Sequence, residues 1–458
     1  MLRRFGTGAH LVNAVSFAVA QLLIAGINLY LLGSIIQALL GLDLFLAVVI
    51  AAVIVLCYIT LGGLSAAIYN EVLQFFVIVA ALTPLTLLGL DRVGGWQGVK
   101  DGIAETAGQG DVPPAADQLN SWPGTALTGF DSELLSVVGI VFGLGFVLSF
   151  GYWTTNFVEV QRAMATDSIS SARKTPIIGA FPKMFVPFIT IIPGMIAAVL
   201  VAEIAEVKAG GDVSGGAEGS VTYNDSLIYL MRDVLPNGLL GVAIAGLLAA
   251  FMAGMAANVS AFNPVFSVDL WERYAVKDRS DGYYLRVGRW ATVGATVVAV
   301  FTAQLAASFS NIMDYLQTLF GFFNAPLFAT FILGMFWKRM TATAGWAGLV
   351  SGTLAAVLVG FLAEGTLGSL SIGVLPLSGQ GAAFVAAGVA FAVDIVVSVA
   401  VSLVTTPKPA HELVGLVYSE TPKEDLIDEA EASYPWYRRT LPLAGIAAVL
   451  TIILNLAF

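Results

Sequence analysis

The sequence has little charge, one cysteine and two histidines. Only 11% of its 458 residues are charged, whereas a soluble domain carries about 25%. The single cysteine, Cys57, excludes an intrachain disulfide. The histidines, His10 and His411, lie far apart, and no helix face carries a metal-ligand spacing, so a metal site is not expected. No nucleophile–base pair or phosphate-binding loop is visible, so the sequence predicts neither an enzyme nor an enzymatic cofactor.

Apolar residues dominate instead, at 58% with a mean hydropathy of +0.86. Runs of about 20 apolar residues recur, each long enough to cross about 30 Å of hydrocarbon. No run alternates as barrel strands do, so the spans are expected to be helices. The chain is therefore predicted to be an all-α polytopic membrane protein with about eleven transmembrane helices. The expected spans are 10–40, 44–63, 72–90, 133–157, 176–202, 238–268, 287–307, 312–336, 343–363, 382–404 and 440–457.

The basic residues predict the orientation, because cytoplasmic loops carry an excess of Lys and Arg. With the N-terminus in the cytoplasm, only Arg92, Lys100, Lys208 and Arg232 of the 21 basic residues fall in outside loops. We therefore expect a multi-pass protein of the cell membrane with a cytoplasmic N-terminus and an outside C-terminus. The net charge of −10 resides mostly in loops. The expected partners are a small-molecule solute and the lipid bilayer, with no nucleic acid and no obligate protein partner.

Several expected spans carry polar or helix-weakening residues. The fourth span contains Gly151 beside Tyr152 and Trp153, which suggests either a bend at a midplane cavity or close packing of small residues. The fifth span contains Lys183, which would cost about 2.5–3.5 kcal/mol facing lipid at the bilayer centre. Lys183 therefore either reaches the interface or lines a polar cavity.

Polar residues also interrupt the sixth and eighth spans. Asn258 in the sixth span needs a partner, which is either another helix or an ion or solute. In the eighth span, Gln317 is followed by Asn324 and Pro326, which predict a broken or bent helix. Because several helices each bring such a segment, their convergence indicates a pathway for a solute.

The sequence resembles the sodium:solute symporter family. The resemblance covers nearly the whole chain and implies a LeuT-type inverted-repeat helix bundle in one transmembrane domain, 1–458. Residues 1–90 would be a remnant of the first repeat, 133–336 the second repeat, and 343–458 peripheral C-terminal helices. The stretches that carry it are "LRRFG" before the first span, "YITLGGLSAAIYNEVLQ", "YWTTNFVEVQRAMATDS", "KMFVPFITIIPGMIAA", "VFSVDLWERY" and "LFATFILGMFWKRMT".

The sugar-transporting branch of that family is the most similar. Its members have a Tyr–Trp pair, a lysine in the next helix and a glutamine further on, which match Tyr152–Trp153, Lys183 and Gln317. The resemblance implies that Tyr152 covers the solute and that Lys183 and Gln317 donate hydrogen bonds to its hydroxyl groups. Asn156, in the same matched stretch, completes the expected substrate-binding set.

The sequence departs from the family in two places. Helices that normally precede "LRRFG" are absent, so the first repeat is expected to be incomplete, with about three more apolar helices encoded upstream of Met1. The family's main sodium site uses two adjacent hydroxyl residues, and an ungapped count places Ala253 and Gly254 there, with Ala250 at a carbonyl position. Asn258 or Ser260 could supply an oxygen from another turn, because sodium prefers oxygen ligands.

Three functions compete on these grounds. The first is a secondary active transporter that couples sodium to the symport of a sugar or polyol, with sodium as the coupling ion. The second is a proton-coupled or uncoupled carrier, which Ala253 and Gly254 favour. The third, of another class, is a non-transporting membrane sensor, although the long loop 405–439 carries no folded signalling domain.

Overall fold

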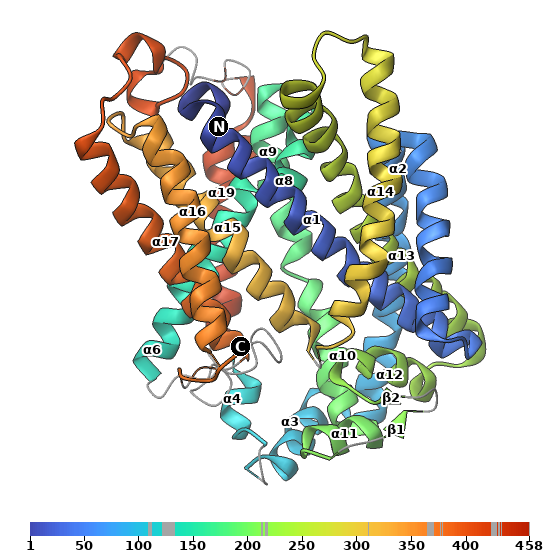
Figure 1. The fold of residues 1–458 in the computed structure, drawn as a ribbon. Coiled ribbons are helices and arrows are strands. Elements are labelled where there is room, and N and C mark those ends of the chain that lie inside the picture. Colours follow the sequence, from blue (N-terminus) through green and yellow to red (C-terminus); the bar gives the residue numbers. More distant parts are fainter. Residues whose placement is uncertain are drawn as a thin grey trace. The chain divides into compact units, whose positions relative to one another are not determined.

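The computed structural model is almost entirely helical (Figure 1). It describes residues 1–108, 112–120, 133–211, 214–215, 219–309, 311–363, 371–375, 377, 379–422, 428, 431 and 433–457. The elements before residue 210 are α1 (Leu2–Leu40), α2 (Leu44–Val93), α3 (Gly95–Thr106), α4 (Ala115–Leu119), α6 (Glu133–Val138), the π-helix η1 (Gly139–Phe150), α7 (Gly151–Thr155), α8 (Phe157–Met164), α9 (Ile169–Lys183), α10 (Val186–Leu200) and α11 (Ala202–Lys208).

A small antiparallel strand pair interrupts the helices after α11. The remaining elements are β1 (Ser214–Gly215), β2 (Gly219–Ser220), the 3-10 turn η2 (Tyr223–Asp225), α12 (Ser226–Val234), α13 (Asn237–Pro264), the π-helix η3 (Val265–Ala275), α14 (Asp281–Ala306), α15 (Ile312–Phe336), α16 (Ala342–Leu362), α17 (Gly379–Val404), the 3-10 turns η5 (Ala410–Glu412), η6 (Tyr418–Glu420) and η8 (Trp436–Arg438), and α19 (Thr440–Ala457).

The expected all-α membrane architecture is confirmed. In the described part of the chain, eight helices are long and apolar enough to span a membrane, and Leu44–Cys57 and Thr440–Leu456 are shorter apolar helices. The two expected spans 44–63 and 72–90 lie within one helical element, α2. The expected span 287–307 is helical in α14 but is not among the eight. Polar side chains within the span lower its hydropathy, namely Arg289, Gln304 and three threonines.

The chain divides into two compact units. Their boundaries differ from those expected for the two repeats, and the repeat boundaries stay a prediction. Unit 1 comprises Met1–Ala20, Thr128–Lys183 and Met313–Phe458, and unit 2 comprises Gln21–Leu127 and Met184–Ile312. The solute residues expected from the sequence all lie in unit 1. The ion residues expected from it all lie in unit 2.

Unit 2 has a core where α2 packs against α13 and α10. Its fully buried side chains include Leu85, Ile196 and Leu230. The helix ends are satisfied locally, as the Asp43 side chain accepts hydrogen bonds from the N–H groups of Phe45 and Leu46 at the start of α2. Such a cap contributes about 0.5–2 kcal/mol to stability.

Unit 1 is organised around α16 and α17, which run side by side (Figure 1). Between them lies a fully buried polar group, because Thr330 and Ser398 donate hydrogen bonds to Asp394 at 2.7 and 2.9 Å. A buried carboxyl group needs such partners, since an unsatisfied one is costly. Gly348 leaves room for this group, since a Cβ there would collide with Ser398 Oγ and Asp394 Oδ1.

The segment Arg4–Phe5–Gly6 ties the start of α1 to the end of α15. The buried Arg4 guanidinium donates hydrogen bonds to Gly334 O and Trp337 O, both at 3.2 Å. These are C-terminal carbonyls of α15, which lack helical partners and attract positive charge. The Phe5 ring occupies the space that a side chain at Gly334 would need. Gly6 has a φ of 77°, which favours glycine.

Replacing Arg4 by Gln is therefore expected to lower the stability of the chain by about 2–4 kcal/mol, because charged hydrogen bonds to buried carbonyls are lost. The thermal unfolding midpoint in detergent measures this loss. Arg3→Gln is the matched control, because Arg3 is exposed. Equal midpoints for the Arg3 and Arg4 variants would contradict this role of Arg4.

Candidate functional site

The helical segment from 133 to 164 is interrupted at one residue. The π-helix η1 continues into α7, and the backbone then leaves the helical conformation at Asn156, with a ψ of 125°, before α8 begins. The sequence placed the bend beside Gly151, but Gly151 has helical backbone angles. The interruption is at Asn156 because its side chain caps α8, accepting a hydrogen bond from the Val158 N–H at 2.9 Å.

The glycines of this segment serve close packing. A Cβ at Gly151 would lie 2.8 Å from the Phe328 ring of α15, and one at Gly143 would lie 2.8 Å from Phe384 O of α17. Both distances are too short for a side chain. Of the two readings of these glycines, close helix packing is confirmed.

Three of the expected solute residues lie close together in unit 1. The Lys183 ammonium lies 4.0 Å from the centroid of the Trp153 ring, a cation–π contact. Lys183 is the last residue of α9, directly after Pro182, and is exposed. The neighbouring Tyr152 ring packs on Phe320 of α15, with centroids 4.8 Å apart. Two aromatic faces and one ammonium group are thus positioned by three separate helices.

Glu159 joins this group, and the sequence did not single it out. Its carboxylate interacts electrostatically with Tyr152 and with the Lys183 ammonium group. Glu159 follows Tyr152 by seven residues, a spacing that would put both side chains on one face of an uninterrupted helix. That spacing was the available signal, but the interruption at Asn156 obscured it.

The other two expected residues, Gln317 and Asn156, are connected through α15. Gln317 precedes Phe320 by three residues and Asn324 follows it by four, so the three share one helix face. Asn156 donates a hydrogen bond to Asn324 Oδ1 at 3.2 Å, and both side chains are buried. The expected interruption near Pro326 is not a break, because α15 is one helical element through that residue, and a bend there stays a prediction.

The Asn156→Ala variant is expected to lose about 1–3 kcal/mol of stability, since both the cap of α8 and the buried contact with Asn324 disappear. Asn156→Ser keeps a capping oxygen and should lose less. Unfolding midpoints of the two variants in detergent test this order. If the serine variant is the less stable, Asn156 does not act as the cap.

The expected ion residues lie on α13 in unit 2. Asn258 donates a hydrogen bond to Gly254 O at 2.7 Å, one turn back on its own helix. A Cβ at Gly254 would collide with Asn28 Oδ1 of α1. Ala253 and Gly254 offer no side-chain oxygen, so these positions do not fit a hydroxyl-lined sodium site. Within the described residues, no group of three or more His, Cys, Asp and Glu side chains could hold a metal ion.

Comparisons with known proteins agree with this architecture. A sequence profile of the sodium:solute symporter family matches residues 1–352. The sodium/glucose cotransporter of Vibrio parahaemolyticus is 28% identical over 338 residues, which are 73% of this chain and 60% of that protein. Sodium/glucose cotransporter 4 of Danio rerio is 29% identical over 415 residues, 88% of this chain and 62% of that protein. The chain thus spans about three fifths of the length of these curated relatives.

One solved structure with a similar fold is described as the substrate-bound outward-open state of a Na+-coupled sialic acid symporter. It matches 89% of this chain and 76% of its own chain with a TM-score of 0.67 at 18% identity. At that identity the likeness concerns the fold alone. The expected LeuT-type helix bundle is confirmed by it.

Proposed function

This chain belongs to the sodium:solute symporter family, and we propose that it is a secondary active transporter that couples the uptake of a sugar or polyol to sodium. The family is one of transporters and not of enzymes. The similar proteins named above are described as sodium/glucose cotransporters, which supports a sugar-like solute.

The observation that carries the proposal is the contact between Lys183 and Trp153, with Tyr152 beside it. A sugar has apolar ring faces that stack on aromatic side chains and hydroxyl groups that both donate and accept hydrogen bonds. An indole ring beside an ammonium group offers both types of contact in one place. Tyr152 is the proposed aromatic lid over the solute, and its ring packs on Phe320.

The other residues complete the proposed solute site. Gln317 contributes an amide that can donate to one hydroxyl and accept from another. Asn156 ends α7 and caps α8, so it sets the position of the α7 turn that carries Tyr152 and Trp153. Lys183 donates to solute hydroxyls, and its contacts with Trp153 and Glu159 position the ammonium group.

Reconstituted uptake tests this proposal. The full chain is purified into liposomes and given labelled glucose, galactose, mannose and myo-inositol, with an inward sodium gradient or with choline in its place. Sodium-dependent accumulation of at least one of these solutes above its external concentration is the expected result. If none of these solutes accumulates in either medium, the sugar assignment is overturned.

A second candidate, sodium-independent transport, is favoured by the geometry at Gly254. The position has no side-chain oxygen, and the Asn28 carboxamide occupies the space where a side chain would extend. In the same liposomes, uptake that persists in choline and collapses with a protonophore supports proton coupling. Uptake that persists with neither gradient supports an uncoupled carrier, and strict dependence on sodium rejects both.

The location proposed for the protein is the cell membrane, with the N-terminus in the cytoplasm and the C-terminus outside. The excess of basic residues in alternate loops supports this orientation. The proposed partners are the solute and the bilayer. Cysteine labelling at position 3, in a Cys57→Ser background, from either side of sealed vesicles tests the orientation.

A further inference from the structure

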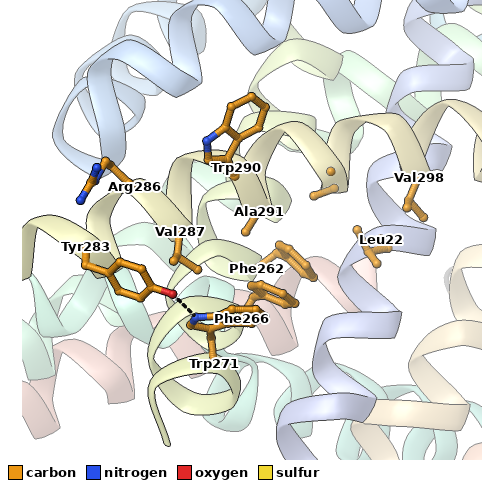
Figure 2. Close-up of a pocket in the computed structure, with 12 residues that line it drawn as sticks. Leu22, Phe262, Phe266, Trp271, Tyr283, Arg286, Val287, Trp290, Ala291 and Val298 are labelled. Carbon is orange, nitrogen blue, oxygen red and sulfur yellow. Dashed lines mark hydrogen bonds between the residues drawn. The ribbon is translucent and has the colours of Figure 1, made fainter. Parts of the chain in front are cut away.

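An apolar groove runs along α14 in unit 2. It encloses about 750 Å³, and α1, α13, η3 and α14 line it (Figure 2). Its walls include the side chains of Leu22, Phe262, Phe266 and Val298. Gly294 forms part of the floor, and a Cβ there would meet no atom within 4 Å. The groove therefore has free space at Gly294, and its volume is large enough for a flexible hydrocarbon chain.

One end of the groove is polar. Arg286 is the charged residue that lines it, and its Nε donates a hydrogen bond to Gly282 O of its own helix, at 3.4 Å. In the described part of the chain, Arg286 has no acidic partner. Beside it, Trp271 donates a hydrogen bond to the Tyr283 hydroxyl at 3.2 Å. Figure 2 shows Tyr283 and Arg286 at one end, and Val298 with Leu22 at the other.

The length of the groove matches half of a bilayer. Arg286 and Val298 are separated by twelve residues of one helix, which is about 18 Å at the helical rise. Half of the hydrocarbon core is roughly 15 Å. Trp290, which is 75% exposed, stands near the polar end, as aromatic residues do at a membrane interface. The groove thus has the length and the polarity of one lipid acyl chain with its headgroup.

We propose that this groove binds an anionic phospholipid, with one acyl chain along α14 and the phosphate at Arg286. An unpaired guanidinium at the lipid headgroup level favours a phosphate that carries net negative charge over a zwitterionic headgroup. The same end carries Arg279 over the Tyr283 ring, 5.9 Å from its centroid. In the proposed orientation this end faces the cytoplasmic leaflet, where anionic lipids are enriched. The proposal does not depend on which solute is transported.

Native mass spectrometry of the purified full chain tests the site with two lipids of equal chain length, dioleoyl-phosphatidylglycerol and dioleoyl-phosphatidylcholine. Phosphatidylglycerol is expected to bind about fivefold more tightly, the ratio for one basic side chain near the membrane surface. Arg286→Gln should bring the ratio close to one. Arg289→Gln is the matched control, because Arg289 is also exposed on α14 but does not line the groove, and it should keep the preference.

A second pair of variants tests the acyl chain. Gly294→Leu fills the groove and should weaken binding of both lipids by about fivefold or more, whereas Gly241→Leu, at another open glycine, should not. Equal binding of the two lipids by the wild type would overturn the proposal, as would equal losses in Arg286→Gln and Arg289→Gln. If the wild type is a dimer and Gly294→Leu is a monomer, the groove binds a second copy of the chain and the lipid proposal is wrong.

Discussion

Replacing Trp153 by alanine is expected to lower solute uptake about 100-fold while the chain stays folded. The indole ring supplies the stacking surface of the proposed site, and the Lys183 ammonium lies 4.0 Å from its centroid. The variant therefore loses a stacking contact and removes one of the two groups that position Lys183. A stacking contact contributes roughly 0.5–1.5 kcal/mol and a charged hydrogen bond about 1.5–3 kcal/mol. Together they account for about two powers of ten in affinity.

Initial rates of labelled sugar uptake over a range of concentrations measure this effect, and the loss should appear mainly as a raised half-saturation concentration. Trp153→Phe keeps an aromatic face and should retain activity within about tenfold of the wild type. Trp436→Ala is the control for loss of an exposed indole, since Trp436 is 67% exposed in η8. Wild-type uptake by Trp153→Ala would remove Trp153 from the solute site.

Introducing a side chain at Gly348 is expected to destabilise the chain by about 3–5 kcal/mol. A Cβ at this position would collide with Ser398 Oγ and Asp394 Oδ1, which belong to a fully buried hydrogen-bonded group. Gly348→Val must either separate α16 from α17 or break that group. Overpacking costs about 1–3 kcal/mol, and a buried polar atom left without its partner costs a similar amount again.

The unfolding midpoint in detergent and the yield of monodisperse protein both measure this loss. Gly445→Val is the matched control, because it adds the same side chain to a membrane helix where a Cβ would meet no atom within 4 Å. If Gly348→Val were as stable as Gly445→Val, the contact between α16 and Asp394 would not be a packing constraint.

The sequence predicted the membrane fold and part of the candidate site, because both leave local signals. Apolar runs mark spans regardless of tertiary structure, and Lys183 is conspicuous in an apolar helix. The family resemblance placed Lys183 and Trp153 in one solute-binding set, and the two side chains are in direct contact, although that contact itself was not predicted. The assigned roles of these residues stay proposals.

Contacts between distant helices left no comparable signal. Asn156 and Asn324 are 168 residues apart, so their hydrogen bond could not be read from either segment. The place of the helix interruption was misassigned to Gly151 because glycine suggests a weak helix, whereas here it permits contact with Phe328. The same holds for Gly254, whose missing side chain is explained only by Asn28 on another helix.

The central claim, a sugar site linked to sodium, is tested most directly by equilibrium binding of labelled glucose, galactose, mannose and myo-inositol to the purified chain in sodium and in choline. Coupling requires that each ligand raise the affinity of the other. The account predicts saturable binding of at least one of these solutes that is about tenfold tighter in sodium and is lost in Trp153→Ala. Binding that is equally tight in both media, or that survives Trp153→Ala unchanged, would contradict it.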